Sequence, residues 1–573
     1  MSYKLPRYFI YLCSLVCANA CAGSNALETQ GSQGWPHGSM AATANPHATD
    51  AAIAMLEKGG HAVDAAIAAH LVLGLVEPQS SGIGGGGFML VYSRDDRSLV
   101  FHDGRETAPA GARADMFMSD GEVMNFLQAW QSGKAIGTPG AVALYKQAHD
   151  AHGRLPWVDL FQPAIVLARN GFEVSPRLAA FLPRLKDVSR LDENPGSKEY
   201  FYPEGEPLQV GYLRKNPAYA ATLTRIAGEG PSAFYEGPIA QQIAQVAQAE
   251  PDPGTLTPAD MAGYEAKLRP VVCGDFAEQQ ICTTSLPSSG AAQIMIAQLY
   301  EQLRSETSSH IFAYVDAQRL AYADRDHYFG DPDFIEVPLQ QLLDPRYIEL
   351  RAQDRFAPNE LPLHGDPRLR LGQRATEQYG IDTTIEASGT THLSIVDKEG
   401  NAVSFTATVE APFGSGRWVE GFLLNNEMTD FAREVPDEGP HPANVIQPGK
   451  RPRSSMSPTM ILDGDGELLM VTGSPGGNSI PAYVSKSILG VMAWDLTPEA
   501  AIGFPNIIAR GQKVRVEIGV EQGPEIASDL KAEGYQVQER EGENSGIHLI
   551  LVTDNGLVGA ADKRREGTVR TTK

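Results

Sequence analysis

The sequence is compatible with an α+β fold, because its local patterns include both helices and strands. Two β-branched runs, Thr390–Val396 and Ala402–Val409, flank a turn-like segment at 397–401, and their loose polar and apolar alternation is typical of a hairpin. Much earlier, Ala62–Val76 is rich in alanine, which favours a helix. Helices and strands are therefore both expected in the body of the protein.

The other elements are expected on both sides of this hairpin. Before it we expect a helix at Ala51–Lys58, which ends at a Gly-Gly pair, and a strand at Phe88–Tyr92, which follows a glycine run. A mostly helical region is expected at 140–350 and a polar linker at 355–388. A glycine pair suits a helix C-terminus. The linker is dotted with proline and glycine, and a segment of this kind is expected to be mobile. After the hairpin, short strands are expected at Met460–Leu462, Glu467–Thr472 and His548–Val552.

The N-terminus has the layout of a secretory signal. Two basic residues precede the apolar run Tyr8–Val16, and small residues follow it at 18–22. Together they predict export and removal of residues 1–22. The protein is therefore expected in the periplasm or outside the cell, and Cys21 leaves bacterial lipoprotein processing open. The alternative is a disordered or membrane-anchored N-terminus.

Composition limits the classes of partner. Of 573 residues, 42% are hydrophobic and 20% charged, as in an ordinary globular enzyme. The net charge of −23 argues against a nucleic-acid partner, which would need basic patches. The glycine run Ser81–Gly87 lacks the Lys-Ser/Thr of a phosphate-binding loop and the spacing of a dinucleotide fingerprint. We expect neither a cofactor nor a metal.

Two cysteines, Cys273 and Cys282, lie in the body of the chain. The flanking runs Pro270–Cys273 and Gln280–Thr283 predict a hairpin that would place the two side by side. Opposed cysteines can form a disulfide in an oxidising compartment. A pair of buried free thiols fits the same pattern.

Thr390 directly follows Gly389 at the start of the first hairpin strand. If the peptide bond between them were cut, Thr390 would carry a nucleophilic hydroxyl and an α-amine with an ordinary pKa of roughly 7.7–8.0, which could act as its base. The alternative is that Thr390 and Thr391 simply fill a strand, as β-branched residues do. On these residues alone, the strand interpretation is the more common one.

Four motifs that follow one another along the chain favour the nucleophile interpretation of Thr390. They are Thr390–Val403, Leu424–Phe431, Arg451–Thr459 and Thr472–Gly477. With them the chain resembles the γ-glutamyltransferases (γ-glutamyltranspeptidases), which belong to the N-terminal-nucleophile hydrolases. The resemblance implies a four-layer αββα sandwich and a precursor that cuts itself into a large subunit, 23–389, and a small subunit, 390–573. Further family landmarks are assigned to scaffold, at Phe234–Gly237, Pro287–Gly290 and Ala323–Arg325.

The resemblance also implies catalytic roles. Thr390 would be the nucleophile and, with Gly389, the site of self-cleavage. Thr408 would hydrogen-bond the nucleophile. Gly476 and Gly477 would form the oxyanion hole, since glycines let backbone N–H groups approach a developing negative charge closely. Without the resemblance, a strand threonine and a plain turn would explain these residues.

For a γ-glutamyl substrate, the resemblance implies a carboxylate site and an ammonium site. Arg105 would bind the α-carboxylate because a guanidinium pairs with it bidentately, supported by the hydroxyls of Ser454 and Ser455. The expected acceptors for the α-ammonium are carboxylates, namely Glu410, Glu427 and Asp430. Taken alone, each of these groups would be interpreted as a solvated surface side chain.

One segment departs from part of the family. Some members carry a tyrosine-bearing lid between the positions of Phe431 and Arg451, whereas this segment contains no Tyr, Phe or Trp. We therefore expect a more open pocket, and the balance between hydrolysis and transfer stays undetermined.

The main hypothesis is thus a γ-glutamyltransferase and glutathione hydrolase that passes the γ-glutamyl group to water, an amino acid or a dipeptide. The nearest alternative is an acylase that removes glutaryl side chains from β-lactams, but a glutaryl group lacks the ammonium that Glu427 and Asp430 would bind. An alternative of another class is a non-catalytic periplasmic γ-glutamyl-binding protein. Thr390, Thr408 and the glycine pair argue against it.

Overall fold

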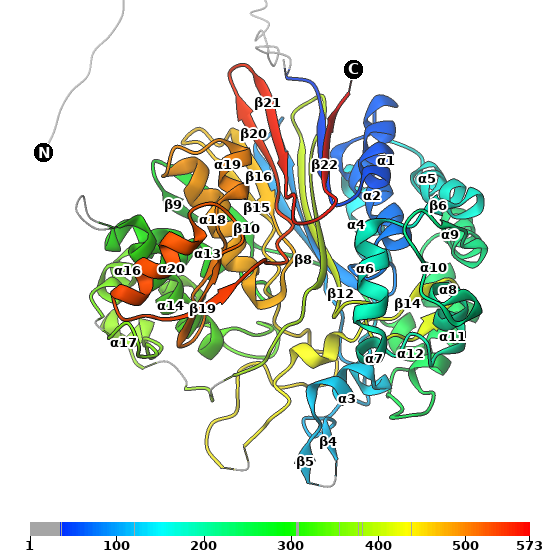
Figure 1. Cartoon of the computed structure of the whole chain (residues 1–573), viewed down its shortest axis with the longest axis horizontal. Helices are drawn as coiled ribbons and strands as arrows, with labels where there is room; N and C mark the ends of the chain where they lie inside the picture. The colour runs from blue at the N-terminus through cyan, green and yellow to red at the C-terminus, as the bar shows by residue number, and fades with distance from the viewer. Residues whose placement is uncertain are drawn as a thin grey trace, which may run out of the picture. The chain divides into compact units, whose positions relative to one another are not determined.

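The predicted hairpin lies inside a seven-stranded sheet (Figure 1). Its strands are β11, Gly389–Val396, and β12, Ala402–Glu410, which pair antiparallel and are buried along their whole length. The sheet has the order β22-β1-β11-β12-β2-β3-β8. Its other strands are β1 (Met40–Thr43), β2 (Gly86–Ser93), β3 (Ser98–Gly104), β8 (Lys267–Arg269) and β22 (Thr568–Thr571). The hairpin is thus confirmed, with β12 one residue longer than predicted.

The computed structural model describes residues 35, 37–119, 121–304, 309–354, 356–375, 378–380, 382–436 and 438–572. The predicted signal segment and Cys21 lie outside these residues. Within them, every helix is too short or too polar to cross a bilayer.

A second, six-stranded antiparallel sheet has the order β21-β20-β16-β15-β10-β9. Its strands are β9 (Val271–Phe276), β10 (Gln279–Thr284), β15 (Thr459–Leu462), β16 (Leu468–Gly473), β20 (His548–Thr553) and β21 (Gly556–Ala561). They contain all the strands predicted after the central hairpin, with ends shifted by one residue, and the predicted cysteine hairpin. Cys273 and Cys282 are opposite each other in β9 and β10, and a disulfide joins them.

The two sheets face each other. β11 and β12 lie against β16, and β11 also lies against β20. Hydrogen bonds that cross the interface include those from Ser394 Oγ to the His548 carbonyl and from Ser404 Oγ to the Thr472 carbonyl, both at 2.9 Å. The Thr459 N–H also donates across it to Ser404 Oγ at 3.1 Å. The buried hydroxyls of Ser394 and Ser404 therefore have hydrogen-bond partners inside the interface.

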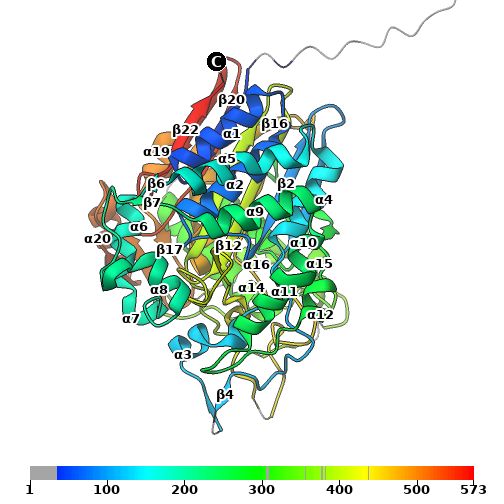
Figure 2. The same cartoon turned by 90° about the vertical axis from the view of Figure 1, so that its right-hand side faces the viewer.

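Helices cover the outer faces of both sheets (Figures 1 and 2). Those in contact with the seven-stranded sheet are α1 (Pro46–Glu57), α2 (Ala62–Val76) and α4 (Ala141–His152). Those in contact with the six-stranded sheet are α13 (Gly290–Leu303), α18 (Ile480–Met492) and α19 (Pro498–Gly503). Both faces of a central strand are consequently apolar: in β2, Phe88, Leu90 and Tyr92 join one hydrophobic cluster while Met89 and Val91 join the other.

The first two helices, α1 and α2, were both predicted from the sequence. α2 has the predicted bounds, whereas α1 begins five residues before the predicted Ala51. Asn45 caps α1, with its side-chain oxygen accepting from the His47 N–H at 3.0 Å, and Pro46 occupies the first turn. Asparagine at the cap and proline just inside it are a strong helix start, which a count of apolar residues does not detect.

Smaller elements surround these layers. The middle region is mostly helical as expected, and its longer helices are α5 (Trp157–Asn170), α6 (Pro176–Arg184), α9 (Pro217–Glu229), α11 (Gly237–Ala247), α14 (His310–Tyr328) and α16 (Pro345–Ala352). Near the C-terminus a three-stranded sheet packs against helix α20 (Gly523–Ala532); its strands are β17 (Ile507–Ile508), β18 (Lys513–Glu517) and β19 (Gln536–Arg540). Short helices complete the inventory at α3 (Phe126–Gln131), α7 (Lys186–Ser189), α8 (Pro195–Phe201), α10 (Ser232–Tyr235), α12 (Pro258–Ala262), α15 (Leu339–Leu342) and α17 (Pro367–Arg370). Two-stranded pairs are β4 (Met118–Ser119) with β5 (Glu122–Val123), β6 (Phe172–Glu173) with β7 (Leu213–Arg214), and β13 (Trp418–Val419) with β14 (Phe422–Leu423).

Candidate active site

The hydroxyls of Thr390 and Thr408 meet at the start of the central hairpin. The two residues are opposite each other in β11 and β12, with 3.2 Å between their Oγ1 atoms. The Thr408 hydroxyl donates to the Gly389 carbonyl at 2.8 Å. Because a hydroxyl has one proton, Thr390 must be the donor in its contact with Thr408. The Thr390 proton therefore points at Thr408, and the Thr390 oxygen lies beside the bond that precedes it.

Two further residues fix this bond. A side chain at Gly389 would bring Cβ within 2.3 Å of the Ala411 backbone, so only glycine fits there. On the other side, Arg565 donates from Nη1 to the Thr390 carbonyl at 2.7 Å and is itself buried. The sequence analysis missed Arg565, since one arginine near the end of the chain carries no local pattern that points to Thr390.

A small cavity opens beside Thr390. Its lining includes most of the predicted catalytic and substrate-binding residues and comes from six separate parts of the sequence: Arg105, Glu386, Ala387, Thr390, Thr408, Glu410, Glu427, Asp430, Ser454, Ser455, Met456, Gly477 and Ile480. Among the predicted residues, Gly389 and Gly476 do not line it; Gly476 lines a larger cleft next to it. The fold thus brings the predicted nucleophile and the predicted substrate groups to one place.

Arg105 is paired with two of the predicted ammonium acceptors. Its Nη2 lies 2.6 Å from Asp430 Oδ2, and its Nη1 contacts Glu427 Oε1. It also donates to the Arg453 carbonyl at 3.0 Å. In the uncleaved chain, Arg105, which is expected to bind the substrate carboxylate, is therefore paired with Glu427 and Asp430, which are expected to bind the substrate ammonium.

The cavity around Arg105 contains more carboxyl groups than guanidinium groups. Glu106, Glu410, Glu427 and Asp430 are all buried, and burial raises the pKa values of the last three well above the usual carboxyl range. Burial also raises the pKa of Glu106 to about 7. Glu427 Oε2, Asp430 Oδ1 and both Glu106 oxygens have no hydrogen-bond partner among the described residues. A cluster with four carboxyl groups and one guanidinium suits a further cation, such as an ammonium group.

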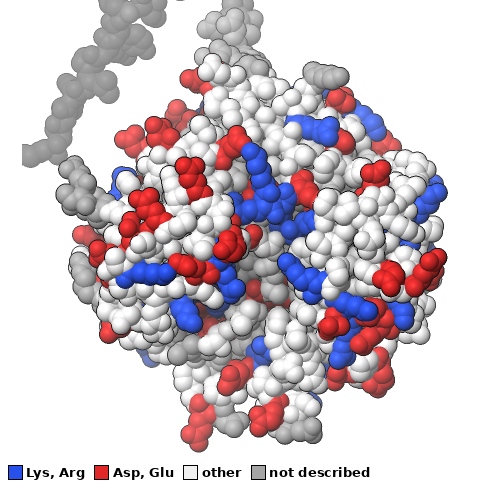
Figure 3. All heavy atoms as spheres, in the orientation of Figure 1, with Lys and Arg blue, Asp and Glu red and all other residues white. Residues whose placement is uncertain are grey.

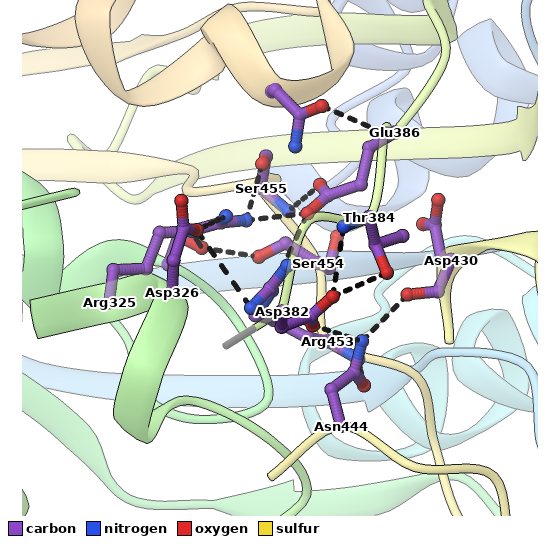
Figure 4. A network of polar contacts seen from close by, with 12 residues as sticks. Arg325, Asp326, Asp382, Thr384, Glu386, Asp430, Asn444, Arg453, Ser454 and Ser455 are labelled. Atoms are coloured by element: carbon purple, nitrogen blue, oxygen red, sulfur yellow. Dashed lines mark hydrogen bonds and ion pairs between the residues drawn. The ribbon is translucent and has the colours of Figure 1, made fainter. Parts of the chain in front are cut away.

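The carboxylate of Glu386 accepts a hydrogen bond from the backbone N–H of Ser455 (Figure 4). Its Oε2 accepts from the Ser455 N–H at 2.8 Å, and its Oε1 accepts from Arg325 Nη2 at 2.6 Å. The same Arg325 nitrogen donates to Ser455 Oγ at 2.6 Å. Burial acts against ionisation of Glu386, but Arg325 and Arg453 prevail and lower its pKa to about 2. A carboxylate from the chain itself therefore lies where Ser455 is expected to help hold a substrate carboxylate.

The family follows from a comparison with known proteins. The family model of gamma-glutamyltranspeptidases matches residues 48–572. The chain belongs to this family. The glutathione hydrolase proenzyme of Escherichia coli (strain K12) is 36% identical over 542 residues, which cover 92% of this chain and 90% of that protein.

Solved structures agree with this assignment. The γ-glutamyltranspeptidase of Helicobacter pylori is 34% identical, with a TM-score of 0.51, and the match covers 54% of this chain and 89% of that chain. A cephalosporin acylase from Bacillus halodurans has a TM-score of 0.80 over 94% of this chain and 96% of its own, at 24% identity. At that identity the likeness shows the fold alone, which is a mixed α/β fold.

In this member of the γ-glutamyltranspeptidase family, the segment before Thr390 is held in place. Asp382 Oδ2 lies 3.0 Å from Arg453 Nη1, and Thr384 donates to Asp382 Oδ1 at 2.5 Å (Figure 4). With Glu386, these residues are buried. In the uncut chain, ion pairs to distant arginines hold Asp382 and Glu386, so this part of the expected linker is anchored before cleavage. Its mobility after cleavage stays a prediction. Arg325 also contributes more than the scaffold role assigned from sequence.

The glycine pair of this γ-glutamyltranspeptidase lies against the same segment. Gly476 and Gly477 have φ angles of 143° and 56°, a region that favours glycine. A Cβ at Gly477 would lie 2.3 Å from the Glu386 carbonyl oxygen. The donor at the Gly389 carbonyl is Thr408. An oxyanion role for the glycine pair therefore stays a prediction for the cleaved form.

Proposed function

We propose that this chain is a self-processing γ-glutamyltransferase and glutathione hydrolase. The family match and the name of the Escherichia coli relative support this activity. The observation that carries it is the hydrogen bond from Thr408 to the Gly389 carbonyl beside the Thr390 hydroxyl. This contact polarises the carbonyl that the nucleophile would attack.

Self-cleavage begins with attack of Thr390 Oγ1 on the Gly389 carbonyl carbon. The hydroxyl proton passes towards Thr408 and finally to the departing Thr390 nitrogen, and the peptide bond becomes an ester. Water then hydrolyses the ester, which leaves a carboxylate on Gly389 and a free amine and hydroxyl on Thr390. The products are a large subunit, residues 23–389, and a small subunit, residues 390–573, which remain together as a heterodimer.

Turnover uses the new N-terminus. The Thr390 hydroxyl attacks the γ-carbonyl of a γ-glutamyl amide, and the Thr390 α-amine takes its proton and passes it to the leaving amine. The γ-glutamyl-threonine ester is then resolved by water or by the amine of an amino acid or dipeptide. Backbone N–H groups of Gly476 and Gly477 would stabilise the oxyanion.

Substrate recognition follows from the charges in the cavity. Once residues 382–388 are released by cleavage, the Ser455 amide loses Glu386 and becomes available to the substrate α-carboxylate, together with Ser454 and Arg105. The substrate α-ammonium would bind among Glu410, Glu427 and Asp430. The excess of carboxyl groups around Arg105 favours a ligand with an ammonium over a glutaryl group, and thus favours γ-glutamyl compounds over glutaryl β-lactams.

The fold and location belong to the same proposal. We assign the two facing sheets and their outer helices to the four-layer αββα sandwich of N-terminal-nucleophile hydrolases. Residues 1–22 would act as an export signal, with lipidation at Cys21 left to experiment. The disulfide between Cys273 and Cys282 is consistent with an oxidising compartment such as the periplasm.

One preparation tests both halves of the proposal. Purified protein is analysed by intact mass for fragments that end at Gly389 and begin at Thr390, and is then assayed with glutathione. Released glutamate measures hydrolysis, and the product formed with an added dipeptide measures transfer. An intact chain with no glutamate release would refute the proposed function, and release of a glutaryl group from a β-lactam without cleavage of glutathione would favour the acylase alternative.

A further inference from the structure

A cleft of about 640 Å³ lies next to the Thr390 cavity. The cavity and the cleft share Glu386. The cleft also contains Ser388, which lies two residues before the proposed nucleophile, and Gly476, one of the two proposed oxyanion glycines. One wall is α6, and the facing wall is formed by β18, β19 and the residues that follow β19. The cleft therefore begins at the reacting bond and extends away from the γ-glutamyl cavity.

Arginines dominate the charge of this cleft. Five line it, from both walls: Arg177, Arg184, Arg515, Arg540 and Arg564. Among the described residues, the acidic ones in the lining are Glu386, which is held by Arg325, and Glu543. In a chain with a net charge of −23, this is a marked local reversal. Figure 3 shows basic side chains gathered near the middle of the face where α6 and β19 lie in Figure 1.

Two of the five arginines are neutralised by carboxylates. Arg515 Nε lies 2.5 Å from Glu543 Oε1, and Arg564 Nε lies 2.7 Å from Glu517 Oε1. Their pairs hold the wall of the cleft together, and they offer little charge to a ligand.

The other arginines keep their charge available. Arg184 and Arg540 are exposed and make no ion pair with any described residue. Arg177 packs its guanidinium against the Phe181 ring at 4.8 Å and donates to Asn544 Oδ1 at 3.1 Å, while its buried Nε has no partner among the described residues. Arg184 packs on Phe181 in the same way at 4.8 Å. The aromatic ring thus holds two guanidinium groups at one wall of the cleft.

We propose that this cleft binds the leaving group and the acceptor, and that Arg184 and Arg540, with Arg177, recognise a carboxylate on them. The inference rests on the proposed function: with the γ-glutamyl end in the cavity and its carbonyl at Thr390, the rest of the substrate extends past Gly476 into the cleft. The preferred compounds are peptides with a free C-terminal carboxylate. In glutathione, the leaving half ends in such a carboxylate.

The test compares two substrates that differ only in this charge: glutathione and its C-terminal amide. Cleaved wild-type protein is expected to have the higher kcat/KM for glutathione. In the double variant Arg184→Gln/Arg540→Gln, this preference should fall by about threefold to tenfold, because two exposed charge pairs are lost. The kcat/KM for the amide should stay within about twofold of wild type, and 0.5 M salt, roughly a 4 Å screening length, should reduce the wild-type preference in the same direction.

Two controls separate charge from structure. The variant Arg184→Lys/Arg540→Lys keeps both charges and should retain most of the preference. Arg113→Gln removes an arginine that is 75% exposed and lies outside the cleft, and it should change nothing. An equal loss on both substrates, or an unchanged preference in the double variant, would overturn the role of the arginines. Wild-type protein that hydrolyses neither substrate would instead overturn the proposed function on which the inference depends.

Discussion

The Thr408 hydroxyl donates to the Gly389 carbonyl oxygen at 2.8 Å, while the Thr390 hydroxyl lies 3.2 Å from the same threonine oxygen. One side chain thus contacts both the carbonyl to be attacked and the hydroxyl that would attack it. Removal of either hydroxyl should affect cleavage in a different way.

Thr390→Ala should remain a single chain and be inactive, because the attacking oxygen is absent. Thr390→Ser keeps this oxygen but loses the methyl group that fixes its rotamer, so it should cleave more slowly. Intact mass spectrometry over a time course measures both. Normal cleavage of Thr390→Ala would remove this residue as the nucleophile.

Thr408→Val removes the donor to the Gly389 carbonyl and keeps the shape of the side chain. Cleavage should slow by roughly 10²- to 10³-fold, the usual effect of the loss of one donor to a developing oxyanion. Thr391→Val is the matched control, because the buried Thr391 hydroxyl has no hydrogen-bond partner among the described residues. Equal cleavage rates for the two valine variants would contradict the role of Thr408.

Glu386→Gln should destabilise the uncleaved chain, which is obtained in the Thr390→Ala background. The substitution removes one of the two carboxylates that Arg325 contacts, and Asp326 remains. A broken buried pair costs at most about 3–5 kcal/mol, so the loss should lie within this limit. In the cleaved protein the effect on Tm should be smaller, because the proposed mechanism releases residues 382–388. Thermal unfolding of both forms measures the difference, and an equal loss of Tm in each would mean that the segment stays bound after cleavage.

Arg105→Lys should raise KM for a γ-glutamyl anilide by about tenfold or more. Lysine keeps the charge but loses the planar fork, and a charge-assisted hydrogen bond is worth roughly 1.5–3 kcal/mol. Steady-state kinetics measure this effect, with Arg113→Lys as an exposed control. Unchanged kinetics would exclude Arg105 from substrate binding.

Glu106→Gln should stabilise the protein increasingly as pH rises. Burial raises the pKa of Glu106 to about 7, so between the ordinary value of 4.5 and about 7 the folded state holds a proton that the unfolded chain releases. The free energy of unfolding of wild type therefore falls with pH across this window, and the variant lacks this fall. The Tm difference should grow up to about pH 7 and then level off. The exposed Glu349→Gln should give a flat difference, and a flat profile for Glu106→Gln would contradict the shift.

Much of the fold was predictable because its signals are local. The hairpin around Thr390 and helix α2 follow from strand and helix patterns within a few residues. The start of α1 was misplaced because Asn45 and Pro46, and not the apolar pattern, decide where that helix begins.

In the candidate site too, residues that belong to local motifs were predicted, whereas their distant contacts were not. Motif residues such as Thr390 and Glu427 were identified, and the fold brings them to one cavity. The partners that hold them were not identified: Glu386 meets Arg325 over 61 positions of sequence and Arg565 meets Thr390 over 175. Such contacts depend on how distant segments pack, and no short pattern in one sequence carries that information. The burial of Asp382, Thr384 and Glu386 was missed for the same reason.

The strand order gives the proposed cut a mechanical consequence. β1 precedes Thr390 in sequence, yet it lies between β22 and β11, which both follow the cut or contain it. In the other sheet, β10 of the first fragment pairs with β15 of the second. The strands of the two fragments would therefore be interleaved. To separate the fragments, four rows of backbone hydrogen bonds must open: β1 with β11, β1 with β22, β2 with β12 and β10 with β15. Neither fragment contains all the strands of the seven-stranded or the six-stranded sheet, so each would need the other during folding. A precursor that folds first and is cut afterwards supplies both in the correct ratio and place.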